Sequence, residues 1–291
     1  FGTPLFVYDE AHLRARCREA VAAFGVGVNF ATKAFLCTAM ARLAAEEGCN
    51  LDVSTGGEYH VARAAGVPAD RLVLHGNNKS SSELRTAMSE GIGRIIIDSF
   101  DEIDRIEALV AEGLPVPRAL IRVTPGVEAH THEAISTAHE DQKFGLSVAS
   151  GMAMTAVDNV LECDSLSLAG LHSHIGSQIF DAIGFELATH RVVDFAVQIK
   201  ERHGISVSEI DVGGGMGIAY VEGDDPLDVD AMAKSILDIV RTECARVNIS
   251  VPRISVEPGR AIIGNPGITL YEVGTVKPIE LDSGITRHYI S

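Results

Sequence analysis

Short apolar runs alternate along most of the chain with longer segments whose apolar residues recur every three or four positions. The short runs predict buried strands, and the longer segments predict amphipathic helices such as 100–112 and 185–203. The expected strands occupy 28–32, 50–54, 71–75, 94–98, 118–124, 166–174, 209–213 and 253–257. Because eight strand–helix units with strands apolar on both faces are typical of a closed barrel, we predict an α/β fold of the (β/α)8 TIM-barrel type.

The competing fold is a doubly wound open sheet. Such a sheet usually has a glycine-rich turn after its first strand, whereas this chain has Lys33 at that point. Helix boundaries are predicted from capping signals. Ser80 with Glu83, and Ser99 with Glu102, have the spacing at which two side chains satisfy each other's free backbone amides.

Both ends of the chain depart from the alternation. Residues 1–8 predict an extra strand, and 268–280 and 287–291 predict strands that no helix follows. We therefore expect three parts: 1–25, the N-terminal strand and helix of a β-rich domain; 26–265, the barrel; and 266–291, the start of a truncated C-terminal β domain. The segment 125–150 has few apolar anchors, and a loop of that length is typical of a lid or binding loop.

Composition excludes several classes of protein. The chain has 24 Lys and Arg against 40 Asp and Glu, a net charge of −16, so it lacks the positive surface that nucleic acid requires. No apolar run has the length of a membrane span. The five cysteines are scattered without a Cys-x-x-Cys pair, which is typical of reduced thiols in a cytoplasmic protein.

Polar residues gather where the predicted strands end. In TIM barrels the chemistry takes place at the carboxyl ends of the strands, in the loops that lead to the helices. The residues at those positions are Lys33, Asp52, His75, Asp98, Arg122, His172, His174, Ser177, Gly213, Gly214, Gly215, Glu257, Gly259 and Arg260.

Three of these features together favour pyridoxal phosphate as a cofactor. Lys33 is either a lysine that reaches the rim of the barrel or a partly desolvated amine able to form an imine. The turns 213–215 and 257–260 are either tight turns or a phosphate site, and barrels often bind phosphate after their last two strands. Glu257 offers the carboxylate that the pyridine nitrogen of this cofactor requires.

A metal site is the main alternative. His172 and His174 are two positions apart on one predicted strand, so both side chains can face the same side, with His75 and Asp98 as further ligands. A metal-dependent barrel hydrolase would use this set, although it leaves Lys33 and the glycine turns without a role. His130, His132 and His139 are expected to be solvated loop residues.

Longer stretches of sequence carry a family resemblance. They are ATKAF around Lys33, LDVSTGGE (51–58), HGNNKS (75–80), GVEAHTHEAISTAHEDQKFGLS (126–147), GLHSHIGSQI (170–179), DVGGGMGI (211–218) and VEPGRAI (256–262). In these motifs the chain resembles the barrel-type (fold type III) pyridoxal-phosphate decarboxylases, and among them the diaminopimelate decarboxylases of actinobacteria. The resemblance covers essentially the whole chain.

The resemblance implies a role for each matching residue. Lys33 would be the Schiff-base lysine, His174 would stack on the cofactor ring, and Glu257 would pair with the pyridine nitrogen. Arg260 would serve both the phosphate and the substrate carboxylate. The remaining cofactor-binding candidates are Asp52, His75, Arg122, Ser177, Gly214, Gly215 and Gly259, and Lys143 resembles a residue near the family's dimer interface.

The implied activity is decarboxylation of meso-2,6-diaminopimelate to L-lysine and carbon dioxide, the last step of lysine biosynthesis. It would take place in the cytoplasm, without a metal, in a homodimer with shared active sites. The family's second domain carries a Cys-Glu-Ser-x-Asp motif and a later Tyr that complete the substrate site, and neither occurs before Ser291. A cofactor-binding fragment without turnover, and a decarboxylase of ornithine, arginine or lysine, therefore remain alternatives.

Overall fold

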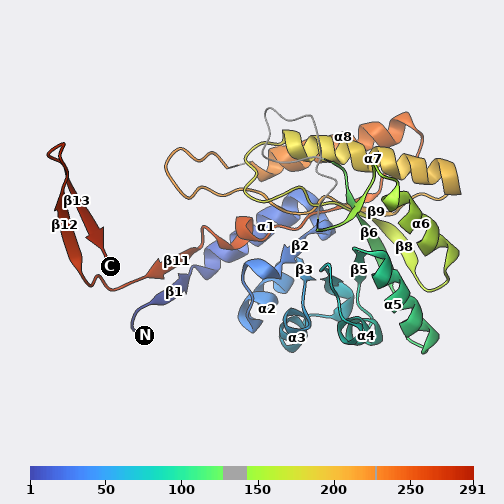
Figure 1. Ribbon diagram of the computed structural model, residues 1–291, viewed down its shortest axis with the longest axis horizontal. Coiled ribbons are helices and arrows are strands. Elements are labelled where there is room, and N and C mark those ends of the chain that lie inside the picture. Colours follow the sequence, from blue (N-terminus) through green and yellow to red (C-terminus); the bar gives the residue numbers. More distant parts are fainter. Residues whose placement is uncertain (127–142, 227) are drawn as a thin grey trace.

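The computed structural model describes residues 1–126, 143–226 and 228–291. Among these residues, eight parallel strands form a sheet in the order β10-β9-β8-β6-β5-β4-β3-β2 (Figure 1). They are β2 (Asn29–Ala31), β3 (Asn50–Val53), β4 (Leu72–Leu74), β5 (Arg94–Ile97), β6 (Arg118–Thr124), β8 (Ser167–His172), β9 (Glu209–Asp211) and β10 (Arg253–Ser255). Each of them overlaps a strand predicted from the sequence.

Backbone hydrogen bonds join the first and last strands of this sheet. The amide of Asn29 donates to the carbonyl of Val256 over 2.8 Å, and the amide of Val256 donates to the carbonyl of Gly27 over 2.9 Å. The sheet therefore closes into a barrel, and the predicted fold class is confirmed. A short strand, β7 (Leu146–Ser147), pairs with β6 outside this circuit.

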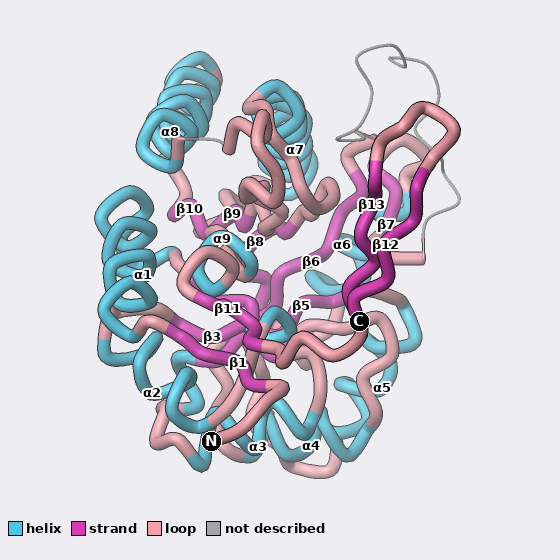
Figure 2. Tube along the Cα trace, turned by 90° about the vertical axis from the view of Figure 1, so that its left-hand side faces the viewer, coloured by secondary structure: helices cyan, strands magenta, loops and turns pink. Residues whose placement is uncertain are grey.

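The helices surround the strands (Figure 2). Helix α1 (Glu10–Phe24) precedes the barrel, and in the described part of the chain each barrel strand is followed by one α-helix before the next strand of the circuit. These helices are α2 (Thr38–Glu46), α3 (Gly56–Ala64), α4 (Ser81–Ser89), α5 (Phe100–Ala111), α6 (Met152–Glu162), α7 (Ile183–His203), α8 (Val229–Arg246) and α9 (Arg260–Ile263). Within the described part of the chain, none of the helices has the length and apolarity needed to cross a membrane.

The core has two parts because successive side chains of a strand face opposite sides of the sheet. The larger part lies between the strands and the helices, and includes Phe30, Leu51 and Ile97. A small separate cluster is formed by Val73, Ile96, Leu120 and Ala169, one from each of β4, β5, β6 and β8. At the equivalent inward positions, β2, β3 and β9 carry the buried polar residues Asn29, Asp52 and Asp211. One side of the barrel interior is therefore apolar and the other is polar.

One of the two predicted capping boxes is confirmed and the other is wrong. Ser80 and Glu83 cap α4 reciprocally. Ser99 makes no capping hydrogen bond at the start of α5. The carboxylate of Glu102 instead accepts from the amide of Asp98 over 3.0 Å, while its other oxygen lies 2.6 Å from the ammonium of Lys79. The side chain of Glu102 therefore pairs with the buried ammonium of Lys79 and does not form a capping box with Ser99.

The strands predicted at the two ends are present. Strand β1 (Leu5–Tyr8) pairs antiparallel with β11 (Gly267–Leu270), and β12 (Val276–Glu280) pairs antiparallel with β13 (Thr286–Ile290). The β12–β13 hairpin projects away from the barrel (Figure 1). Most of the atypical segment 125–150 lies outside the described residues, including His130, His132 and His139.

Candidate active site

A cavity of about 480 Å³ opens at the carboxyl ends of the strands. Its wall combines residues from the loops that follow β2, β8, β9 and β10. Seven of the predicted site residues line it: Lys33, His174, Ser177, Gly215, Glu257, Gly259 and Arg260. The structure therefore brings the lysine and both predicted phosphate turns to one cavity, whose volume is typical of a small-molecule site.

Lys33 lies in a single 3-10 turn, Thr32–Ala34, directly after β2. The hydroxyl of Thr32 donates to the carbonyl of Asp52 over 2.7 Å, which fastens this turn to the end of the neighbouring strand β3. Lys33 itself is exposed, so the desolvation considered from the sequence is not present. Its amine is instead accessible to a carbonyl compound in the cavity.

The triple-glycine turn after β9 packs too closely against its neighbours to accept side chains. A Cβ atom on Gly214 would lie 2.1 Å from the carbonyl oxygen of Glu257, and one on Gly215 would lie 2.2 Å from that of Gly176. Gly215 also has a φ of +106°, a conformation that favours glycine. Its backbone and the hydroxyl-bearing Ser177 both line the cavity, and such exposed amides are suited to bind an anion.

Arg260 adds a positive charge on the same side of the cavity. It follows Gly259 directly and begins the short helix α9. Its guanidinium carbon lies 5.7 Å from the ring centroid of Tyr220, which lines the cavity as well. Tyr220 was not predicted as a site residue, since its only signal in the sequence is its place in the loop that follows β9.

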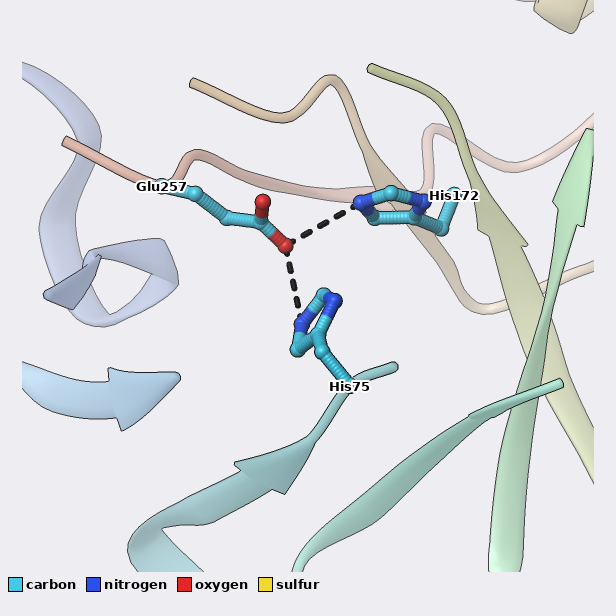
Figure 3. A group of neighbouring side chains, drawn as sticks. All are labelled: His75, His172 and Glu257. Atoms are coloured by element: carbon cyan, nitrogen blue, oxygen red, sulfur yellow. Dashed lines mark ion pairs between the residues drawn. The ribbon is translucent and has the colours of Figure 1, made fainter. Parts of the chain in front are cut away.

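Two histidines converge on one carboxylate oxygen at the floor of the site (Figure 3). Nε2 of His75 lies 2.9 Å, and Nε2 of His172 lies 3.1 Å, from Oε1 of Glu257. All three side chains are buried, and Oδ1 of Asp52 lies 3.7 Å from the same Nε2 atom of His75. The second oxygen of Glu257 is free of these contacts, and Glu257 lines the cavity. His75 and Asp52 act on the cavity through Glu257 and are not part of its wall.

Burial and charge set the ionisation of this cluster. Burial raises the pKa of Glu257, but the two imidazoles outweigh it and hold that pKa well below its usual range. Burial lowers the pKa of His75, but the carboxylates of Asp52 and Glu257 outweigh it and raise that pKa. Burial lowers the pKa of His172 to about 3 and raises that of Asp52 to about 6. The site therefore holds an ionised carboxylate beside the cavity.

His174 presents a neutral ring to the same cavity. Burial lowers the pKa of His174 to about 4, and its Nδ1 accepts a hydrogen bond of 3.2 Å from the amide of Gly214. Such a neutral ring is able to pack against a flat aromatic ligand. Gly214 does not itself line the cavity, because its amide is directed at His174.

The metal ligands proposed from the sequence do not come together as expected. Strand β8 ends at His172, so strand alternation does not extend to His174, whose Nδ1 is bonded to Gly214. Asp98 accepts from the amide of Gly145 over 2.6 Å and lies 3.5 Å from Arg122. The group with metal-like spacing among the described residues is His75, His172 and Glu257, whose ligand atoms lie within 4.8 Å of one another.

Arg122 and Lys79 are two further basic residues near the strand ends, and neither lines the cavity. The guanidinium of Arg122 lies over the ring of Phe144, 4.6 Å from its centroid, and Lys143 is 5.2 Å from the same centroid. The ammonium of Lys79 is buried and donates to the carbonyls of Gly76 over 2.7 Å and Ile96 over 2.6 Å. Lys79 was not predicted as a site residue, although it stands in HGNNKS directly after a strand.

Comparison with known proteins agrees with this geometry. Residues 10–264 match the family described as pyridoxal-dependent decarboxylase, pyridoxal binding domain. The chain is 53% identical over 297 residues to diaminopimelate decarboxylase of Mycobacterium tuberculosis, covering 100% of this chain and 66% of the relative. The Bacillus subtilis enzyme of that name is 43% identical over 284 residues, covering 96% of this chain and 65% of the relative. The chain therefore spans slightly less than two thirds of the length of these relatives.

Solved structures give the same match. Diaminopimelate decarboxylase from M. jannaschii in complex with L-lysine superimposes with a TM-score of 0.90 at 32% identity, over 100% of this chain and 67% of that chain. The enzyme from Helicobacter pylori, also in complex with L-lysine, has a TM-score of 0.83 at 28% identity, over 95% of this chain and 68% of that chain.

Proposed function

The chain belongs to the pyridoxal-dependent decarboxylases, and from this premise we propose that it binds pyridoxal phosphate and takes part in the decarboxylation of meso-2,6-diaminopimelate to L-lysine and carbon dioxide. The observation that carries the proposal is that Lys33, Gly215, Glu257 and Arg260 line one cavity. The choice of substrate is supported by relatives of that name and by matching structures solved in complex with L-lysine.

The residues of the cavity fit this cofactor. Lys33 supplies an amine for its aldehyde, and the backbone of Gly215 with Ser177 and Arg260 suits its phosphate. The ionised carboxylate of Glu257 suits a protonated ring nitrogen. The neutral ring of His174 offers a surface for the flat pyridine ring.

When bound, pyridoxal phosphate supplies a ring that withdraws electrons from the Cα–carboxyl bond of an amino acid. Glu257 holds a proton at the ring nitrogen, because its carboxylate stays ionised between His75 and His172. Lys33 would hold the cofactor through its amine, at the position that the amine of the substrate also needs. Arg260 would hold the phosphate and orient the substrate carboxylate, and an ordered geometry of this kind accounts for much of an enzyme's rate enhancement.

Four further features are proposed from the resemblance and the sequence pattern. The enzyme would be a homodimer with shared active sites, and Lys143 would lie near the subunit interface. It would act in the cytoplasm. Residues 1–25 and 266–291 would belong to a β-rich domain apart from the barrel at 26–265, and the pairing of β1 with β11 supports this division. Light scattering of the purified protein tests the dimer, for which we expect twice the mass of one chain.

The cofactor proposal is tested by covalent labelling. Borohydride reduction of protein incubated with pyridoxal phosphate should leave a pyridoxyl group on Lys33, identified by peptide mass spectrometry. Lys33→Ala should abolish the label and the visible absorbance. Lys234→Ala, an exposed lysine of α8, is the matched control and should keep both. Unchanged labelling of Lys33→Ala protein would contradict the proposal.

A second function is favoured by the length of the match. Because the chain spans 66% of its mycobacterial relative, it can also be a cofactor-binding part that does not turn over substrate alone. Carbon dioxide release from diaminopimelate should be measured for this chain and for a longer chain that continues past Ser291. Release only by the longer chain supports the second function. Ornithine, arginine and lysine as competing substrates test the choice of amino acid.

A further inference from the structure

A chain of buried hydrogen bonds crosses the barrel interior from the strand that leads to Lys33 to the glycine turn. Nδ2 of Asn29, on β2, donates to Oδ2 of Asp211, on β9, over 2.9 Å. The other oxygen of Asp211 accepts from the amide of Gly213 over 2.8 Å. Asn29 and Asp211 are both buried, and neither lines the cavity.

The same series of hydrogen bonds continues outward to the edge of the barrel. Nδ2 of Asn50, on β3, donates to Oδ1 of Asn29 over 3.2 Å and to the carbonyl of Val26 over 3.1 Å. The order of donors and acceptors along this series of hydrogen bonds is therefore determined at both ends. The Val26 carbonyl can only accept, and the Gly213 amide can only donate. Asn29 cannot turn its amide group without losing a hydrogen bond.

The glycine turn depends on these bonds for its position. Gly213 has a φ of +75°, and its amide bonds to Asp211, while the amide of Gly214 bonds to His174. Among the described residues no hydrogen-bond acceptor contacts the amide of Gly215, the one residue of the three that lines the cavity. Two amides hold the turn in place and the third is left for a ligand.

We propose that Asp211 and Asn29 are positioning residues, which hold the Gly213–Gly215 turn in the conformation that binds the cofactor's phosphate and set its position relative to Lys33. The inference rests on the proposed function, because it concerns the phosphate of pyridoxal phosphate. It assigns a role to two buried polar residues that do not line the cavity. It also explains why a carboxyl group and an amide occupy inward positions on the polar side of the barrel.

The test compares two ligands that differ only in the phosphate. Apoprotein is titrated with pyridoxal phosphate and with pyridoxal. The ratio of the dissociation constant for pyridoxal to that for pyridoxal phosphate measures how much the phosphate contributes to binding. Asp211→Asn places two amide donors against each other, since Asn29 cannot turn. We expect the affinity for pyridoxal phosphate to fall about tenfold and the affinity for pyridoxal to stay unchanged.

A double variant provides the rescue. In Asn29→Asp/Asp211→Asn protein, the new amide at 211 accepts from Gly213 and donates to the new carboxyl at 29, which accepts from Asn50. Every hydrogen bond of the chain is then formed again, and we expect the wild-type ratio. Glu209→Gln is the control, because Glu209 is a buried carboxylate on the same strand, held by Arg94 and Arg253 at the other end of the barrel. It should lower thermal stability and leave the ratio unchanged.

Each outcome decides between separate claims. Equal loss of affinity for both ligands in Asp211→Asn protein, or no loss, overturns the positioning role. The positioning role is also overturned if the ratio of dissociation constants in the double variant stays about tenfold below the wild-type ratio. If Asp211→Asn protein does not fold, the double variant and Asn29→Ala carry the test, and Asn29→Ala should lower the ratio about threefold. Wild-type protein without preference for the phosphorylated ligand would instead contradict the proposed cofactor.

Discussion

Nε2 of His75 lies 2.9 Å from Oε1 of Glu257, a contact that crosses the mouth of the barrel from the end of β4 to the end of β10. His172 approaches the same oxygen from β8, so two imidazoles hold one carboxylate from two directions. The contacts keep Glu257 ionised in spite of its burial. They also leave its second oxygen for a ligand, which gives the carboxylate a definite charge and orientation at the cavity.

Glu257→Gln removes that charge and nearly preserves the shape of the side chain. We expect kcat/KM for decarboxylation to fall about 100- to 1,000-fold, because a neutral amide does not stabilise a protonated ring nitrogen. Affinity for pyridoxal phosphate should change much less, since the phosphate contacts remain. Steady-state kinetics with diaminopimelate and a cofactor titration separate the two effects. Full activity of Glu257→Gln protein would exclude this role for the carboxylate.

The burial of His172 predicts how stability depends on pH. Its pKa is about 3 in the folded protein against 6.5 ordinarily, so the unfolded chain binds more protons between these values. Stability should therefore fall as the pH drops from 6.5 towards 3. Asp52 acts in the opposite sense, because its pKa is raised from 3.8 to about 6 and the folded state gains the proton first.

The contribution of His172 is isolated by substitution. His172→Gln should flatten the fall in melting temperature between about pH 6.5 and pH 4, because the titrating group is gone. His60→Gln, an exposed histidine of α3, should follow the wild-type curve. Differential scanning calorimetry across this range makes the comparison. Parallel curves for His172→Gln and wild-type protein would show that another group governs the acid limb.

Local patterns in the sequence were sufficient for the strands and for the residues at their ends. Lys33, Glu257 and the glycine turn follow from the rule that barrel loops at the carboxyl ends of strands carry the chemistry. Interactions distant in sequence were not predictable in this way. Glu102 has a capping-box spacing, yet it pairs with Lys79 from the preceding β–α unit, and Asn29 meets Asp211 across 182 positions. His172 and His174 were assigned to one strand, but β8 ends between them.

The pair of Lys79 and Glu102 is expected to support the site through stability. Both side chains are buried, and their charged atoms lie 2.6 Å apart. Lys79→Met leaves the charge of Glu102 buried and unpaired, which should lower the free energy of unfolding by about 3–5 kcal/mol. Urea denaturation measures the change.

Two further variants separate charge from packing in that experiment. Lys79→Met/Glu102→Gln removes the unpaired charge and keeps an acceptor for the amide of Asp98, so it should recover part of the loss. Arg85→Met breaks a pair with Glu112 whose side chains are 47% and 53% exposed, and should cost less than about 1 kcal/mol. A loss in Lys79→Met protein no larger than that of Arg85→Met would contradict the argument.

The crowding around Gly215 predicts a specific effect on the phosphate site. Gly215 and Gly223 have nearly the same φ, +106° and +101°, so alanine at either position would have a φ that side chains rarely adopt. A Cβ atom on Gly215 would lie 2.2 Å from the carbonyl oxygen of Gly176, whereas one on Gly223 meets nothing within 4 Å. Gly215→Ala must therefore displace the turn, and we expect its affinity for pyridoxal phosphate to fall more than tenfold. Gly223→Ala should lose a similar small amount of stability from strain and keep the wild-type affinity. Equal affinities of the two variants would mean that the close approach of the turn to Gly176 has no part in cofactor binding.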